Sequence, residues 1–520
     1  MFAGVRRVLS CVLVTAGVMG ALAAPAQADP CPADLYEAAQ HHVDPYPYYG
    51  ASPQDPVEAV YYVNEGLREM TKTLGGAPGP ISRLVAAANI AVYDTLNSIY
   101  YSRAEANATG TPSSEVCGWE PYSTLVRVDP DVIDADLAVG WAAWWVVDNL
   151  LSHIDVPNGG NASVTWIGHI QARWPDIPTS FGDESFELGY TIAQAVFGMR
   201  EFDGWNNSTS YTIGTTPGAW RLTGGGCTSP ATPNWGSVTP WTLSSGSQYR
   251  PALPGGYSTY SSLLASTFYA NQFQEVKDYG RATGSSRSAD QTEQAWFWAN
   301  DADGTYKPPG QLLDHTEVVA KTQPGAVLSG DPEDFATEWS QQPLRVARLF
   351  AAVSIAMADS AIAAWDAKYL TSIDLWRPVT GIQLASTDGN SATVEESTWT
   401  PLGPTPCFPA WISGHATFAG TWGQIMENEF AGVDADDPFP LELGTDDPNA
   451  ANVTREFDTF DEAAEENAFS RILLGVHWRV DGVDGLATGR SVANHVTANA
   501  LRFNHSCPSW NCFDQDLSAP

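Results

Sequence analysis

The feature that most constrains the fold is a stretch, residues 132–153, that is apolar on almost every side of a helix. Its large apolar side chains are Leu137, Val139, Trp141, Trp144, Val146, Val147 and Leu150. A helix that is hydrophobic all round is buried among other elements rather than exposed on a surface. The sequence therefore predicts a sizeable protein built around a central buried helix.

Apolar residues recur at helical spacing along most of the chain, and alternating strand-like runs are few. In the first half the pattern predicts three further helices, over residues 57–73, 81–99 and 185–199. In the second half it predicts helices over residues 257–281, 288–299, 332–367, 416–429, 457–474 and 480–500. We therefore expect an all-α fold of two helical-bundle halves, residues 29–256 and 257–520, with no short internal repeat.

A long irregular segment, residues 201–256, separates the two sets of helices. It is rich in Gly, Pro, Ser, Thr and Asn, and it is too long for an ordinary connection. Its tryptophans, Trp205, Trp220, Trp235 and Trp241, favour a packed cover over a flexible linker.

The first 28 residues have the pattern of a secretory signal. Arg6 and Arg7 precede a mainly apolar run, and Ala26-Gln27-Ala28 fits the cleavage rule. A membrane anchor is the weaker interpretation because the run is short and ends at Pro25. No later segment has the apolar length to span a bilayer, so we expect a secreted, extracellular protein without a membrane partner.

Cysteine usage agrees with export. Six cysteines follow the expected signal: Cys31, Cys117, Cys227, Cys407, Cys507 and Cys512. An even number in an exported chain predicts up to three disulfides, among fifteen possible pairings. A zinc site is disfavoured because the chain has no CxxC motif or Cys/His cluster.

The formal net charge is −35, and the chain has only five lysines. This composition excludes a nucleic-acid binder acting through a general basic surface. It also means that any anion site needs positive charge placed locally by a few residues.

Three short segments near the C-terminus supply such charge. They are Trp376-Arg377-Pro378, Ser413-Gly414-His415 and the run from Ser470-Arg471 through His477 to Asp481. Guanidinium groups bind tetrahedral oxyanions in bidentate fashion, and histidines move protons near neutral pH. Ser413 precedes a predicted helix, whose N-terminus also favours an anion. His477 and Asp481 are four apart and share a face if one helix runs through both, and Gly475 indicates a turn after Arg471. In isolation each segment is commonplace, as a buried histidine or a serine cap; the ordered set predicts an oxyanion site.

Read together, these segments resemble the vanadium-dependent haloperoxidases and the related type 2 phosphatidic acid phosphatases. That family has a Lys, then Arg-Pro, Ser-Gly-His and Ser-Arg-x5-His-x3-Asp, which fall here on Lys368, Arg377-Pro378, Ser413 to His415 and Ser470 to Asp481. The segment Phe408 to Phe418 and Trp365 match the haloperoxidase branch, and the likeness extends upstream through residues 275–277 and 297–301. The resemblance implies a helical fold with a vanadate site in the C-terminal bundle.

Position by position, the resemblance implies a role for each residue. His477 would be the nitrogen ligand of vanadate, while Lys368, Arg377, Ser413, Gly414 and Arg471 would bind its oxygens. His415 would be the acid/base, Asp301 (less favourably Asp303) would pair with the basic groups, and Asp481 would orient His477. Trp365 and Phe408 would flank the halide.

Two positions depart from the family pattern. Lys368 and Arg377 are nine residues apart, one or two more than the family's usual spacing, so the reach of Lys368 to the oxyanion depends on the loop between them. Ile412 stands where the family usually has Pro before the Ser.

The resemblance implies a haloperoxidase that uses hydrogen peroxide to oxidise bromide, with chloride as a second halide, to hypohalous acid that reacts with a small organic acceptor. The same cradle would accept phosphate, with His477 as nucleophile, so a secreted acid phosphatase is the alternative. A third interpretation is a helical binding protein without turnover. Halide preference, acceptor, disulfide pairing and oligomeric state are not readable from the residues.

Overall fold

The computed structural model describes residues 56–107, 118–152, 159–175, 177, 182–322, 343–430, 441–504 and 514–516. The predicted signal segment and four of the six cysteines, Cys31, Cys117, Cys507 and Cys512, lie outside these residues. Within them the chain is mainly helical, and the strands form only three two-stranded sheets. The all-α prediction is confirmed.

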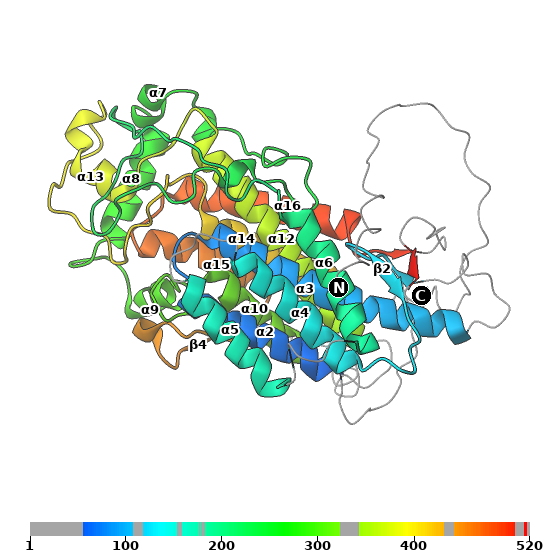
Figure 1. Ribbon diagram of the computed structural model, residues 1–520. Coiled ribbons are helices and arrows are strands. Elements are labelled where there is room, and N and C mark those ends of the chain that lie inside the picture. The colour runs from blue at the N-terminus through cyan, green and yellow to red at the C-terminus, as the bar shows by residue number, and fades with distance from the viewer. Residues whose placement is uncertain are drawn as a thin grey trace, which may run out of the picture.

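In the described part of the first half, five α-helices pack as a bundle (Figure 1). They are α2 (Pro56–Thr73), α3 (Pro78–Asn107), α4 (Ala135–Ser152), α5 (Gly159–Arg173) and α6 (Glu184–Arg200). Helix α4 is the predicted apolar helix, and it packs against α3, α5 and α6. Short strands β1 (Gly118–Trp119) and β2 (Leu125–Arg127) follow α3 and pair with β5 (Phe503–Asn504) and β6 (Asp514–Asp516).

The second half contains the remaining α-helices of the described residues. They are α7 (Tyr260–Leu264), α8 (Thr267–Tyr279), α9 (Ala289–Phe297), α10 (Pro308–Thr322), α12 (Pro343–Tyr369), α13 (Pro378–Gln383), α14 (Gly414–Glu429), α15 (Phe460–Leu473) and α16 (Arg479–Asn499). A hairpin of β3 (Leu441–Gly444) and β4 (Thr454–Phe457) connects α14 to α15. The short helices α7, α8 and α13 lie at the end of the molecule remote from β2 (Figure 1).

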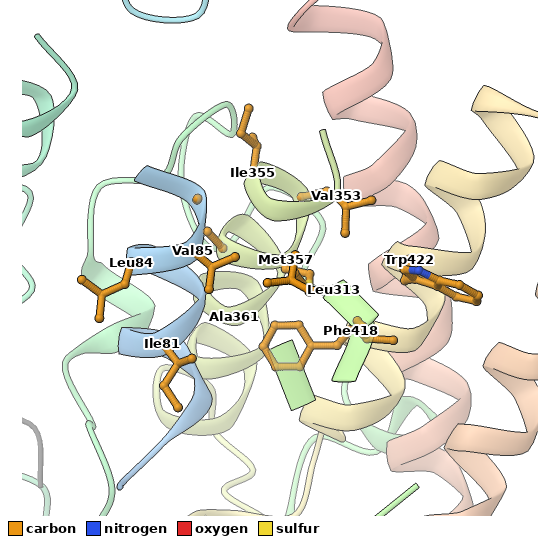
Figure 2. Packing of buried hydrophobic residues seen from close by; sticks show 14 of the residues in the cluster. Ile81, Leu84, Val85, Leu313, Val353, Ile355, Met357, Ala361, Phe418 and Trp422 are labelled. Carbon is orange, nitrogen blue, oxygen red and sulfur yellow. The ribbon is translucent and has the colours of Figure 1, made fainter. Parts of the chain in front are cut away.

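Helix α12 joins the two bundles. Every one of its residues is buried, and it packs against α3 of the first bundle and against α14 and α16 of the second. Figure 2 shows Val85 of α3 beside Met357 of α12, with Phe418 of α14 close to Met357 and Trp422 of α14 farther along the same side. Among the described helices only α12 has the length and apolarity to cross a membrane, but 94% of its most apolar window is buried inside the protein, as in the core helix of a soluble fold.

The irregular segment over residues 201–256 is a packed cover, as its tryptophans predicted. Trp220, Trp235 and Trp241 are buried. The segment contains two single-turn helices, η2 (Trp235–Ser237) and η3 (Pro254–Gly256). It is tied to α12 by an Arg250–Asp366 ion pair of 2.6 Å, and to the loop before α14 by the disulfide Cys227–Cys407.

Two helices were missed by the sequence pattern, and one predicted helix is divided. Helix α5 buries only Ala162, Trp166 and Ile170, a stripe too narrow to stand out. Helix α10 begins with two prolines, Pro308 and Pro309, and was also overlooked. The predicted helix over residues 257–281 is two helices, because Ser266 caps a new one by accepting from Tyr269 N–H. The division of the chain at residue 256 stays a prediction.

Candidate active site

The predicted residues come from five separate elements that meet at one end of the second bundle. Lys368 lies in the last turn of α12, and Arg377 lies just before α13. Ser413, Gly414 and His415 form the N-terminus of α14. Arg471 is in the last turn of α15, and His477 and Asp481 flank the start of α16. The structure therefore brings together residues that span more than a hundred positions of sequence.

The turn between Arg471 and His477 depends on Gly475. Its φ is +77°, a conformation that strongly favours glycine, and an added Cβ there would lie 2.3 Å from the carbonyl oxygen of Gly280. Helix α15 therefore ends before His477, and α16 begins only at Arg479. No single helix runs through both His477 and Asp481, yet the two side chains meet because this turn places the imidazole over the first turn of α16.

The His477 imidazole is held by Asp481. Nδ1 of His477 lies 2.9 Å from Oδ2 of Asp481, which also accepts from the backbone N–H of Trp478 at 2.9 Å. A carboxylate accepts, so Nδ1 donates and Nε2 keeps its lone pair. Burial, followed by nearby Arg377, holds the pKa of His477 well below its ordinary value, so the ring is neutral. Burial raises the pKa of Asp481 to about 7, and the Trp478 N–H works against that rise.

Arg377 crosses the site with one nitrogen left free. Its Nε donates to the Phe408 carbonyl at 2.8 Å, and its Nη1 donates to the Val476 carbonyl at 2.7 Å and lies 3.1 Å from Nε2 of His477. Its Nη2 is buried and has no partner. Burial lowers the pKa of Arg377 to about 9, so the guanidinium remains charged at neutral pH.

Arg471 leaves two more nitrogens free. Its Nη2 donates to Oδ2 of Asp301 at 2.7 Å, while its Nε and Nη1 are buried without a partner. Burial would raise the pKa of Asp301, but Arg471 and then His415 hold it below its usual range. The pairing of Asp301 with a basic group is as predicted, and Asp303, whose side chain is almost fully exposed, pairs instead with Lys307.

His415 stands at the accessible side of the site. Its Nε2 lies 3.0 Å from the carbonyl oxygen of Ala299 and 3.8 Å from Oδ1 of Asp301. Burial, and then Arg471, lower the pKa of His415 to about 4. His415, Asp301 and Phe408 are half-buried, whereas Lys368, Arg377, Arg471 and His477 are fully buried, so the site opens past His415 and Phe408.

Lys368 reaches the site, but its three donors are all used. Its Nζ donates to the carbonyl oxygens of Pro409 at 2.8 Å, Ala410 at 3.1 Å and Ile412. An ammonium group has three donors, so it is saturated by the backbone just before α14. Burial, and then Arg377, hold its pKa well below the ordinary value. Lys368 adds charge and fixes this loop; its direct bond to an oxyanion stays a prediction.

Trp365 and Phe408 lie together, with ring centroids 4.9 Å apart. The Trp365 ring is fully buried and donates from Nε1 to the Ala231 carbonyl at 3.2 Å. Phe408 covers both Lys368 and Arg377, whose charges lie 4.8 Å from its ring centroid. Phe408, not Trp365, is therefore the member of this pair that faces the opening.

Sequence reasoning missed two contributors. The Ala299 carbonyl holds His415, and Asn300, which is fully buried with φ +37°, turns the chain so that Ala299 and Asp301 face the site from either side. A buried Asn in the left-handed region marks such a turn. The motif over residues 297–301 pointed to this segment but not to the role of its backbone.

The site fits a tetrahedral oxyanion. Three buried guanidinium nitrogens, Arg377 Nη2, Arg471 Nε and Arg471 Nη1, have no partner, and buried donors normally have one. The N-terminus of α14 adds a positive helix end at Gly414, and His477 Nε2 offers one lone pair. Among the described residues no group of three or more His, Cys, Asp and Glu side chains is placed to hold a metal cation.

Comparisons with known proteins agree with this geometry. Residues 348–506 match the family described as the VCPO second helical-bundle domain. The vanadium chloroperoxidase of Curvularia inaequalis is 31% identical over an alignment of 238 residues, and the match covers 38% of this chain and 37% of that protein. The chain thus spans little more than a third of the length of this curated relative.

Two solved structures share the fold of nearly the whole chain. The first bacterial vanadium-dependent iodoperoxidase has a TM-score of 0.65 at 22% identity and covers 88% of this chain and 99% of its own. An apo-type bacterial vanadium-dependent chloroperoxidase has a TM-score of 0.58 at 15% identity and covers 81% and 93%. The resemblance to vanadium haloperoxidases is confirmed, and it is carried by the match of residues 348–506 to the VCPO second helical-bundle domain and by the shared fold.

Proposed function

We propose that this protein is a secreted vanadium-dependent haloperoxidase that uses hydrogen peroxide to oxidise halide to hypohalous acid. The observation that carries the proposal is the set of three unpaired, buried guanidinium nitrogens beside the neutral His477. The names of the relatives, a chloroperoxidase and an iodoperoxidase, support the same reaction class.

Vanadate would be held by residues that the fold has already positioned. Arg377 and Arg471 would donate to its oxygens, the Gly414 N–H would do so from the helix end, and His477 Nε2 would be its protein ligand. When bound, vanadate supplies a Lewis acid that polarises peroxide without changing its own oxidation state. The charges that stabilise it are buried, where electrostatic interactions are strongest.

His415 would move the protons of peroxide. Its Nε2 is engaged by the Ala299 carbonyl, so Nδ1 is the nitrogen available for proton transfer. The depressed pKa keeps the ring neutral, so it can accept a proton from incoming peroxide and return it to the departing oxygen. Asp301 holds Arg471 and lies near this ring, which fixes their mutual position.

Phe408 would form the wall that halide meets at the opening, with Trp365 behind it. We propose bromide as the halide, with chloride as the second to be tested, and a small organic molecule as acceptor. Export is supported by the disulfide Cys227–Cys407, because such bonds persist in oxidising compartments.

The test is a halogenation assay of the vanadate-reconstituted protein with hydrogen peroxide, a phenol-type acceptor and chloride, bromide or iodide in parallel. The expected result is vanadate-dependent halogenation with at least one halide. The vanadium-free protein is assayed beside it for phosphate-ester hydrolysis, which the same cradle could support. Full vanadate binding without halogenation would overturn the proposal, and phosphatase turnover would then identify the alternative.

A further inference from the structure

The two bundles are built in the same way. In the first, α3 packs against α4 and α6, and α4 packs against α5 and α6. In the second, α12 packs against α14 and α16, and α14 packs against α15 and α16. The chain order of the helices is also the same, so α3, α4, α5 and α6 correspond to α12, α14, α15 and α16.

The central helices of the two bundles are related residue by residue. The run Asn89-Ile-Ala-Val-Tyr-Asp94-Thr95 of α3 matches Ser354-Ile-Ala-Met-Ala-Asp359-Ser360 of α12 with a constant shift of numbering. Asn89 Nδ2 donates to Ser354 Oγ at 3.0 Å, so two equivalent residues touch each other. Contact between a residue and its own equivalent is the property of a two-fold axis.

A second pair of equivalent residues makes the same bonds. Asp94 is fully buried and accepts from three successive backbone N–H groups, those of Tyr122, Ser123 and Thr124. Asp359 is fully buried and accepts from those of Trp241, Thr242 and Leu243. In each case the middle residue also donates its side-chain hydroxyl.

The correspondence continues into the active site. Counted along α3 with the same shift, the equivalent of Lys368 is Arg103. Lys368 donates to backbone carbonyls just before α14, and Arg103 donates to the Pro130 carbonyl, just before α4, at 3.0 Å. Both cations therefore support the entrance to the next helix.

The helix starts also align. Ser413 Oγ accepts from Ala416 N–H, three residues on, and Asp134 Oδ1 accepts from Leu137 N–H, again three residues on. The backbone N–H of Ser413 donates to the first turn of α16 at 2.9 Å, and that of Asp134 donates to the Ser185 hydroxyl in the first turn of α6 at 2.9 Å.

This alignment makes Asp136 the equivalent of His415. In the second bundle Arg471, near the end of α15, faces this position. In the first bundle Arg173, the last residue of α5, makes an ion pair with Asp136, which also accepts from Nε1 of Trp174. The position of His477, two before the start of α16, is occupied by Gly182, two before the start of α6.

We propose that the bundle of α3 to α6 is a structural copy of the site-bearing bundle, with its oxyanion cradle closed by its own carboxylate, Asp136. It follows that removal of this carboxylate uncovers a second, weaker site for tetrahedral oxyanions at Arg173. An anion can reach that arginine because 27% of its side chain is exposed. The interpretation of the second-bundle site as an oxyanion site rests on the proposed function. The correspondence of the helices in the two bundles does not depend on it.

The test uses the full-length protein loaded with vanadate, so that the site in the second bundle is occupied. Thermal unfolding is followed against increasing phosphate, with chloride at matched ionic strength as reference. We expect phosphate at millimolar concentrations to raise the melting temperature of Asp136→Ala but not that of the wild type, because ligand binding to the native state stabilises it. Equilibrium dialysis against excess vanadate should show a second, weakly held vanadate only in Asp136→Ala.

The matched control is Asp203→Ala, which removes the partner of another buried arginine of this bundle, Arg83. An equal response to phosphate in both variants, or none in Asp136→Ala, overturns the inference. If Asp136→Ala does not fold, Asp136→Asn carries the same test, because it removes the charge but keeps an acceptor for Trp174. Failure of the wild type to bind vanadate would instead count against the proposed function.

Discussion

The two bundles place an arginine near the end of the third helix of each bundle, paired with a carboxylate in both, but they leave different numbers of its nitrogens free. In the first bundle, Arg173 is neutralised by Asp136 within the same fold. In the second, Arg471 and Arg377 keep three buried nitrogens without a partner, and the position of Asp136 holds a neutral histidine. One scaffold thus supports either a closed ion pair or an open anion site, and the difference lies in a few side chains at the helix ends.

The comparison indicates that the open site lowers the stability of the vanadate-free protein. A buried donor without a partner costs about 1–3 kcal/mol, and more when it is charged. In the first bundle the Asp136 carboxylate pairs with Arg173 and reduces that cost, leaving Nε as the buried nitrogen of this guanidinium without a partner. The second bundle retains the cost, which is expected where a ligand supplies the missing partners.

The largest expected effect is that of His477→Ala, whose position in the first bundle is occupied by Gly182. We expect loss of vanadate retention and a fall in halogenation to background, because His477 Nε2 is the fully buried neutral nitrogen that lies beside Arg377 in the site. Bound vanadium after dialysis and bromide oxidation measure this. His495→Ala, on the same helix α16 but bonded to Thr242 and Tyr249 instead, is the control that should retain both. Normal vanadate binding by the His477 variant would show that His477 is not the protein ligand of vanadate.

His415→Ala should separate binding from chemistry. The variant is expected to hold vanadate, because His415 bonds to the Ala299 carbonyl and not to the cradle, but to lose about 10²–10⁴-fold in kcat, the range for an acid/base group. Dialysis and steady-state kinetics measure the two properties. A large rise in vanadate dissociation with unchanged kcat would show that His415 holds the anion instead.

A third prediction compares the equivalent arginines directly. Arg471→Met should weaken vanadate roughly 10- to 100-fold, since a hydrogen bond to a charged group contributes about 1.5–3 kcal/mol. Arg173→Met should leave vanadate affinity unchanged but lower the stability of the vanadate-free protein, because Asp136 loses its partner. Titration and thermal unfolding of both variants measure this. Equal loss of affinity in the two would mean that the bundles are not independent.

The sequence indicated both the helical fold class and a set of side chains that the structure brings together, but not the backbone contacts that position them. The ordered segments identified Arg377, His415, Arg471 and His477 because the chemistry of an oxyanion demands specific side chains, which are visible in sequence. The saturation of Lys368 could not be predicted, since it depends on backbone carbonyls that carry no sequence signal.

The relation between the bundles was missed for a similar reason. Only three of the seven residues in the matched runs of α3 and α12 are identical, Ile, Ala and Asp. The pairing shows itself in space, through Asn89 and Ser354 and through the bonds of Asp94 and Asp359. Helix α5, the counterpart of the helix that carries Arg471, buries too few side chains to be recognised from periodicity.

The last comparison concerns the pair Asp94 and Asp359, which affects stability and not vanadate binding. Burial raises the pKa of Asp94 to about 6 from an ordinary value of 3.8, despite its hydrogen bonds, and burial raises that of Asp359 in the same direction. Between the two pKa values of Asp94 the native state binds more protons than the unfolded state, so this carboxyl makes the protein less stable as pH rises from about 4 to about 6. A shift of about two units corresponds to about 3 kcal/mol.

Asp94→Asn removes this titration, so its free energy of unfolding should rise relative to that of the wild type across the same pH window. Asp359→Asn should show a change of the same sign, because Asp359 holds the equivalent loop by accepting from three successive backbone N–H groups, as Asp94 does. Urea unfolding at pH 4, 5, 6 and 7 measures both, with the exposed Asp131→Asn as control. If the free energy of unfolding changes with pH in opposite directions for Asp94→Asn and Asp359→Asn, the two central helices are not equivalent. Similar changes would show that the two carboxyl groups are equivalent in their effect on stability as well as in their geometry.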